Sequence, residues 1–240
     1  SLHDALPIYV LNNNKIVDAI QNIHLTKNDL HGDQKLQKAQ QDATNELNYL
    51  TNLNNSQRQS EHDEINSAPS RTEVSNDLNH AKALNEAMRQ LENEVALENS
   101  VKKLSDFINE DEAAQNEYSN ALQKAKDIIN GVPSSTLDEA TIEDALLELQ
   151  NARESLHGEQ KLQEAKNQAV AEIDNLQALN PGQVLAEKTL VNQASTKPEV
   201  QEALQKAKEL NEAMKALKTE INKKEQIKAD SRYVNADSGL

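Results

Sequence analysis

The sequence has no cysteine, no tryptophan, and few other aromatic residues: one phenylalanine and four tyrosines among 240 residues. Without cysteine, the chain can form no disulfide, thiolate nucleophile or zinc-thiolate site. Aromatic side chains dominate the buried area of large cores, so their scarcity argues against one thick globular core. Five glycines and five prolines are too few for a turn-dense all-β protein.

The charge and hydropathy of the chain exclude two further classes. No run approaches the roughly 18 apolar residues of a membrane-spanning helix, so this segment is not expected to insert into a membrane. The net charge is −15, which argues against a nucleic-acid partner because phosphates would be repelled. Hydrophobic residues make up only 36% of the chain, so disorder is an alternative to a helical, repetitive fold.

The chain repeats itself with a period of 126 residues. The sequence LHGDQKLQ at 30–37 recurs as LHGEQKLQ at 156–163, and LNEAM at 84–88 recurs at 210–214. A fixed period of this kind is typical of repeat architectures. The chain therefore holds the tail of one unit, one whole unit and most of the next, and we expect it to come from a longer array.

Apolar spacing within the unit predicts helices. Residues 36, 39, 43, 47 and 50 are Leu or Ala at steps of three and four, which places them on one helical face. Met88 and Met214 lie on similar faces and are expected to pack in cores. The pattern predicts helices at approximately 13–30, 33–51, 55–67, 71–97, 111–130, 137–156, 159–178, 181–194 and 197–225.

Helix-start signals recur in register. Each consists of a capping side chain followed three residues later by Glu or Gln, which can reach back to the capping residue. The expected pairs are Ser70 with Glu73, Thr196 with Glu199, Asn54 with Gln57, Asn180 with Gln183, Asn109 with Glu112, and Thr136 with Glu139. Pro181 and Pro198 fall in first helical turns, where no intrahelical donor is lost.

The fold class predicted is all-α: tandem three-helix bundles joined by long shared helices into an elongated rod. The helix expected at 71–97 would span roughly 40 Å, too long for one such bundle. Its first half can close one bundle and its second half can open the next. At 156–158 there is no proline, and a glycine inside a helix costs only about 1 kcal/mol, so a second shared helix is expected there.

Residue clusters that resemble functional sites have simpler explanations. His31 and His157 each stand alone beside a glycine at a helix junction, and are expected at helix ends or on the surface. The run at 62–64, His-Asp-Glu, points in different directions on a helix, and ligands would need i, i+4 spacing. Asn109–Glu112 lacks the glycine of a calcium loop and fits a helix start instead. We therefore expect no catalytic, cofactor-binding or metal-binding residues, no cofactor and no enzyme activity.

The motifs resemble two known module types. The stretch from Ala39 to Leu78, which includes INSA at 65–68, resembles a GA-type three-helix module, a class first known for albumin binding. The stretch from Leu84 to Gly158, which includes FINED at 107–111, resembles a FIVAR module. Their alternation is similar to the Ebh-type giant extracellular-matrix-binding surface proteins of Gram-positive cocci.

The resemblance implies an order of modules along the chain. The C-terminal helix of a FIVAR module would occupy 9–29. GA-like modules would occupy 30–80 and 156–206, a FIVAR module 81–155, and a truncated FIVAR module 207–240. Residues 1–8 fit the repeat poorly and are interpreted as a non-native segment, with a divergent loop as the alternative. Because the last unit stops early, apolar residues 210, 214, 217 and 221 should lack partners, and 207–240 should fray or pair with another chain.

The resemblance also implies a function. It favours a non-catalytic spacer of a bacterial cell-surface or cell-wall adhesin, a monomeric rod with weak multivalent attachment to matrix fibronectin and a role in envelope integrity. A dedicated serum-protein binding module is the alternative. Albumin binding is doubtful, because the second helix of the first GA-like module is almost wholly polar and neither copy offers an aromatic anchor there. The binding residues stay unknown.

Overall fold

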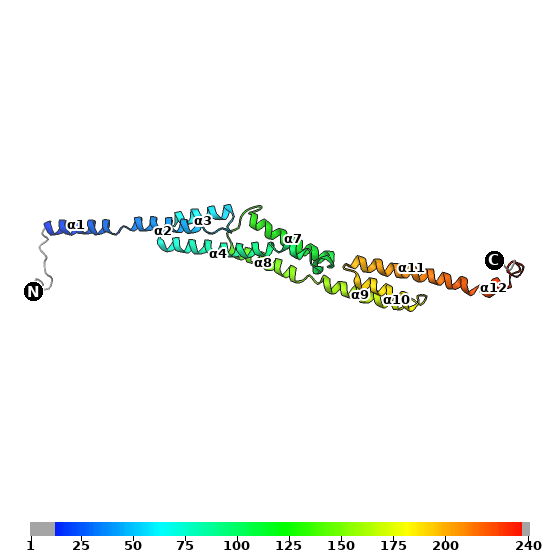
Figure 1. Cartoon of the computed structure of the whole chain (residues 1–240). Coiled ribbons are helices and arrows are strands. Elements are labelled where there is room, and N and C mark those ends of the chain that lie inside the picture. Colours follow the sequence, from blue (N-terminus) through cyan, green and yellow to red (C-terminus); the bar gives the residue numbers. More distant parts are fainter. Residues whose placement is uncertain (1–12, 237–240) are drawn as a thin grey trace, which may run out of the picture. The chain divides into compact units, whose positions relative to one another are not determined.

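The computed structural model describes residues 13–236, and every regular element among them is an α-helix, which confirms the all-α prediction. None of these helices is long and apolar enough to cross a membrane. In chain order the helices are α1 Asn13–Asp29, α2 Gly32–Leu47, α3 Asn55–Ser67, α4 Arg71–Val95, α5 Glu98–Val101, α6 Ser105–Ile108, α7 Glu112–Asn130, α8 Glu139–Glu154, α9 Gly158–Asp174, α10 Pro181–Gln193, α11 Lys197–Asn222, α12 Lys224–Ala229 and α13 Ser231–Val234 (Figure 1).

The chain divides into two compact units. The first comprises the described residues up to Glu92 together with Asp127–Glu143, and the second comprises Asn93–Lys126 with the described residues from Asp144 onward. Residues 1–8, interpreted above as a non-native segment, lie outside the described residues.

The first unit contains a bundle of α2, α3 and the N-terminal part of α4. Its apolar seams bury Leu47, Ile65 and Ala81 at 1% exposure or less, so the helical period read from the sequence matches the packed face. Arg58 on α3 satisfies the end of α2: its guanidinium donates to the carbonyl oxygens of Leu47 at 2.9 Å and Leu50 at 2.6 Å. Carbonyls at a helix end run out of intrahelical donors, and the Leu47 carbonyl accepts one further turn hydrogen bond, from the Leu50 N–H at 3.0 Å.

The start of α3 is bound to the loop before α8 within the same unit. The Gln57 side chain donates to the Thr136 carbonyl at 2.8 Å, and the Ser135 hydroxyl donates to Asn54 Oδ1 at 2.9 Å. Gln57 is fully buried. A local helix cap thus also serves as a tertiary contact.

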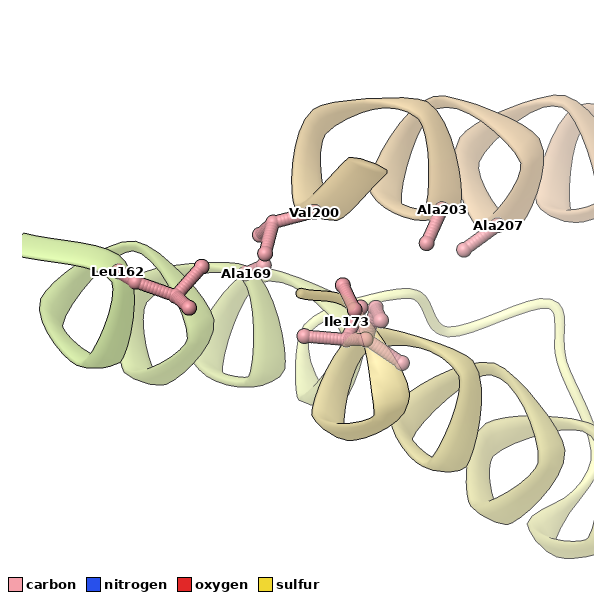
Figure 2. Close-up of a cluster of buried hydrophobic side chains, with 8 residues drawn as sticks. Leu162, Ala169, Ile173, Val200, Ala203 and Ala207 are labelled. Carbon is pink, nitrogen blue, oxygen red and sulfur yellow. The ribbon is translucent and has the colours of Figure 1, made fainter. Parts of the chain in front are cut away.

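The second unit contains the equivalent bundle of α9, α10 and α11, which pack pairwise. Figure 2 shows side chains of α9, such as Ala169 and Ile173, facing those of α11, such as Val200 and Ala203. The small residues let the helices approach closely, and no aromatic is needed. The buried cluster consists of Leu162, Ala169, Ile173, Val191, Ala194, Val200, Ala203 and Ala207.

A second bundle in this unit includes parts of α7 and α8 and holds most of the aromatic packing. Tyr118 on α7 is 1% exposed, and its ring meets Phe107 of α6 edge-on, with centroids 5.9 Å apart and planes at 69°. Phe107 lies on α6, and the repeat places Tyr233 at the matching position on α13. No helix was predicted for the segment 98–110, but it contains the short helices α5 and α6.

Three of the expected capping boxes are confirmed, and a fourth is present in altered form. Asn54, Asn180 and Thr196 each accept from the backbone N–H three residues on, and the Gln or Glu there reaches back. Ser70 also accepts from the N–H of Glu73 at 3.2 Å, but the Glu73 carboxylate binds the Ser70 hydroxyl. Local spacing was therefore a sound guide to these helix starts.

Two expected caps are wrong. Asn109 does not cap α7: its Oδ1 accepts from the backbone N–H of Lys197 at 2.9 Å, at the start of α11. Thr136 does not cap α8: Asp138 does, because its carboxylate accepts from the Thr141 N–H at 3.2 Å. In each case the side chain accepts from a backbone N–H other than the one predicted: a distant one for Asn109 and a nearer one for Thr136.

The shared helix expected across 156–158 is also wrong. Helix α8 ends at Glu154 and α9 begins at Gly158. The intervening His157 N–H binds Glu110 Oε2 at 2.6 Å instead of continuing the helix. The helix was expected to continue because a glycine inside a helix costs only about 1 kcal/mol. Tertiary contacts from α6 and the residues after it break the helix nevertheless.

The apolar side chains at the end of α11 are exposed, as expected. Leu217 and Ile221 are 52% and 58% exposed, whereas Leu91, the repeat equivalent of Leu217, is fully buried. Leu210 and Met214 are partly buried, so their expected lack of partners is only partial. Fraying or pairing of 207–240 stays a prediction.

Candidate functional site

A polar network joins the two bundles of the second unit. Asn109, 1% exposed, donates to the Ser195 carbonyl at 3.1 Å and accepts from Lys197 N–H at 2.9 Å. Lys161 on α9 binds both Glu110 and Asp111, and Lys197 Nζ lies 2.9 Å from Asp111. Side chains that the sequence assigned to a simple helix start therefore bind two helices of the next bundle.

The pKa values of the two carboxyl groups show how the network is balanced. Burial alone would raise the pKa of Glu110, but hydrogen bonds from Lys161 and from the His157 and Asp111 backbone N–H groups outweigh it and lower the pKa. Hydrogen bonds from Lys161 and then Lys197 lower the pKa of Asp111 to about 2. Both carboxylates are ionised at neutral pH, which fixes the network in its charge-paired form.

A partly buried ion pair joins α8 to the end of α4. Arg153 Nε donates to Glu94 Oε1 at 2.6 Å, and the Glu94 side chain is only 8% exposed. The hydrogen bond to Glu94 raises the pKa of Arg153. Burial raises the pKa of Tyr118, and the charges of Glu94 and Glu98 add to this rise. A hollow of about 290 Å³ beside Arg153 is lined mainly by apolar side chains, among them Leu97, Val101 and Leu156.

The second helices of the two GA-like bundles have different surfaces. On α10, Leu185 and Leu190 are 68% and 48% exposed. The matching positions on α3 are Gln59 and Glu64. A shallow groove of about 260 Å³ beside Leu190 contains no aromatic residue. The exposed face is thus moderately apolar in one copy and polar in the other, as the sequence indicated.

The residues weighed as sites occupy the positions expected of solvated or packing residues. His31 and His157 lie at helix starts, and each ring Nδ1 contacts the carbonyl two residues before it at 2.6 Å. His62 Nδ1 lies 3.3 Å from an exposed Asp63 carboxylate. Met88 is fully buried and Met214 partly so.

One convergence of ligand-type side chains was missed by the sequence argument. Glu61 and Glu64 on α3 and His80 on α4 place one ligand atom each within 4.8 Å of one another. A signal was present: Gln57, Glu61 and Ile65 follow one another at steps of four on the inner face of α3, so a Glu occupies a core position. The repeat places Glu187 at the same point in α10.

Two module families match the chain. The GA module model matches 33–87 and 159–213, and the FIVAR domain model matches 87–157 and 213–240. The matches alternate, and the first GA match meets the FIVAR match at residue 87, inside α4.

Similar sequences and structures come from staphylococci. The chain is 42% identical over 223 residues to an extracellular matrix-binding protein EbhA of Staphylococcus aureus, covering 92% of this chain but only 3% of that relative. A crystal structure of an EbhA domain from S. aureus matches with a TM-score of 0.78 and 27% identity, covering 83% of this chain and 81% of that one. A structure from work on Embp-mediated Staphylococcus epidermidis adherence to fibronectin matches at 36% identity and a TM-score of 0.50, covering 52% and 99%.

Proposed function

The chain belongs to the Ebh-type family of extracellular matrix-binding proteins built from alternating GA and FIVAR modules, and from this we propose that it is a rod-like spacer segment. In this proposal its attachment to matrix proteins such as fibronectin is weak per module and multivalent, it contributes to envelope integrity, and it performs no catalysis. Like its relatives, the segment belongs to an extracellular protein of the bacterial cell surface. The module bounds 30–80, 81–155, 156–206 and 207–240 are part of the proposal.

The observation that carries the spacer role is the continuity of α4. This helix runs without a break from Arg71 to Val95, through residue 87 where the GA and FIVAR matches meet. Its 25 residues would span roughly 37 Å. In the proposal, this continuous helix takes the place of a linker between the two modules.

The other module boundary supports the same role by a different means. The backbone breaks between α8 and α9, but α6 packs against α9, and the network around Asn109 and Glu110 spans the junction. Buried, hydrogen-bonded side chains resist bending more than a solvated linker would.

Weak binding per module is favoured by what the exposed surface offers. Strong hot spots are usually aromatic or arginine side chains in desolvated pockets. Tyr118 is buried, and Phe107 packs against it. Tyr49 and Tyr233 are 83% and 56% exposed, so neither ring is desolvated as a strong anchor usually is. Repetition along a long array can then supply avidity that one unit lacks.

The alternative, a dedicated serum-protein module of the albumin type, rests on one observation. Leu185 and Leu190 give the second GA module an exposed apolar face. The first module has Gln59 and Glu64 at those positions, so such binding would be confined to one copy.

Titration of the 240-residue chain against fibronectin and against albumin separates the two functions. At physiological salt we expect no saturable binding to albumin. We expect only weak binding to fibronectin, with a dissociation constant above the micromolar range. Surface plasmon resonance with immobilised ligand measures both. Saturable albumin binding at micromolar concentration or below, abolished by Leu185→Gln with Leu190→Glu, would establish the alternative.

A further inference from the structure

We propose that Glu61, Glu64 and His80 form a binding site for a divalent transition-metal cation, best suited to Zn²⁺, on the first GA module. The three residues come from two helices of the same unit: the two carboxylates from α3 and the imidazole from α4. Glu61 and Glu64 are three residues apart and so lie on neighbouring points of one helical face. His80 Nδ1 approaches Glu61 Oε1 to 2.9 Å from the facing helix.

The position of Glu61 is the strongest indication of a missing partner. Its side chain is 0% exposed, and its only short polar contact among the described residues is the 2.9 Å approach of His80 Nδ1 to Oε1. That imidazole is itself a proposed ligand, and Oε2 has no donor. A buried carboxylate without donors is costly to a folded protein, and a bound cation is one of the few groups that can satisfy it.

The local charge also favours a cation. The carboxylates of Glu64 and Asp77 interact electrostatically with the buried Glu61 carboxylate, and His80 is the one basic side chain in this group. A divalent cation would offset the excess of negative charge.

The donor set selects the class of metal. One imidazole nitrogen and two carboxylate oxygens are ordinary ligands of Zn²⁺, and three protein ligands leave a fourth position for water. Ca²⁺ and Mg²⁺ prefer more oxygen ligands and avoid imidazole. Tetrahedral binding needs ligand atoms about 3.3 Å apart. The ligand atoms lie within 4.8 Å of one another and reach the tetrahedral distance when the side chains of Glu64 and His80 rotate. Both side chains have room to do so, because Glu64 is exposed and the His80 side chain is 43% exposed.

The second GA module provides an internal comparison. The equivalent residues there are Glu187, Leu190 and Lys206. Leucine cannot bind a metal, and the Lys206 ammonium, which lies 2.6 Å from Glu202, supplies fixed positive charge near Glu187. Glu187 Oε2 also lacks a hydrogen-bond donor, but the other two ligands are absent there. The same bundle is thus built without the ligand set, so the site is not required by the fold.

Zinc titration of the tag-free chain tests the proposal. By isothermal titration calorimetry we expect one Zn²⁺ to bind per chain with a dissociation constant in the micromolar range. We expect no saturable binding of Ca²⁺ or Mg²⁺. Co²⁺ should give the intense visible absorption of a tetrahedral site. The two substitutions His80→Lys and Glu64→Leu copy the second module and should preserve folding, checked by circular dichroism.

Each of these substitutions should weaken Zn²⁺ binding by more than about tenfold, because even the outer partners of metal ligands are worth 10–100-fold. His62→Gln, on the same helix but outside the cluster, is the matched control and should leave binding unchanged. The proposal is overturned if the chain shows no stoichiometric Zn²⁺ binding, which would make Glu61 and His80 a plain ion pair. It is also overturned if His80→Lys and Glu64→Leu bind Zn²⁺ as tightly as the unchanged chain.

Discussion

Replacing Gly158 with alanine is expected to destabilise the second unit by about 3 kcal/mol, at the upper end of the cost of overpacking. A Cβ at this position would lie 2.5 Å from the carbonyl oxygens of Ser105 and Asp106 and 2.6 Å from the Glu110 nitrogen. These are backbone atoms and cannot swing aside as a flexible side chain can. The added methyl group would push α9 away from α6 and weaken the bond between His157 N–H and Glu110.

The repeat supplies a matched control for this substitution. Gly32 holds the same position in the preceding 126-residue repeat, and a Cβ there would meet nothing within 4 Å. Gly32→Ala should therefore leave stability unchanged or raise it by up to about 1 kcal/mol, through helix propensity. Urea unfolding followed by circular dichroism measures both changes. Equal stability of the two variants would show that the junction is looser than the structure indicates.

Replacing Arg153 with methionine is expected to cost about 2–3 kcal/mol of folding stability. The substitution leaves the Glu94 carboxylate, 8% exposed, without its 2.6 Å charged partner and beside buried Tyr118. The expected loss is below that of a fully enclosed pair because 32% of the Arg153 side chain reaches solvent.

An exposed ion pair in the same bundle is the control for Arg153. Lys124 and Glu148 join α7 to α8, whereas Arg153 and Glu94 join α8 to α4, and the side chains of Lys124 and Glu148 are about half exposed. Lys124→Met should therefore change stability by less than about 1 kcal/mol. Thermal and urea unfolding of both variants give the comparison. If Arg153→Met were no more damaging than Lys124→Met, the buried pair would have no special role in this core.

The helices could be predicted from the sequence because their causes are local. Apolar spacing and the Asn-to-Gln caps at Asn54 and Asn180 act within one or two turns, and the bounds of α3 follow from them. The shared helix α4 was also predictable, since nothing in 71–95 interrupts its apolar face.

Features that depend on distant contacts could not be predicted in this way. Asn109 has the local pattern of a helix cap, but its partner, Lys197, is 88 residues away in sequence. The break before Gly158 results from close approach of the α6 backbone, which no propensity scale contains. Likewise, the proximity of Glu61 to His80 depends on how α3 packs against α4. The sequence contained one indication of this contact, namely that a Glu occupies a core-facing position in both repeats.

The central claim is that this segment works by repetition, and the most direct measurement is fibronectin binding as a function of repeat number. Chains of one, two and four 126-residue units would be compared on immobilised fibronectin at physiological salt. The proposal predicts weak binding by one unit and an apparent affinity that rises steeply with unit number, mainly through slower dissociation. Binding by one unit that is already as tight as binding by four would contradict it and identify a dedicated binding module.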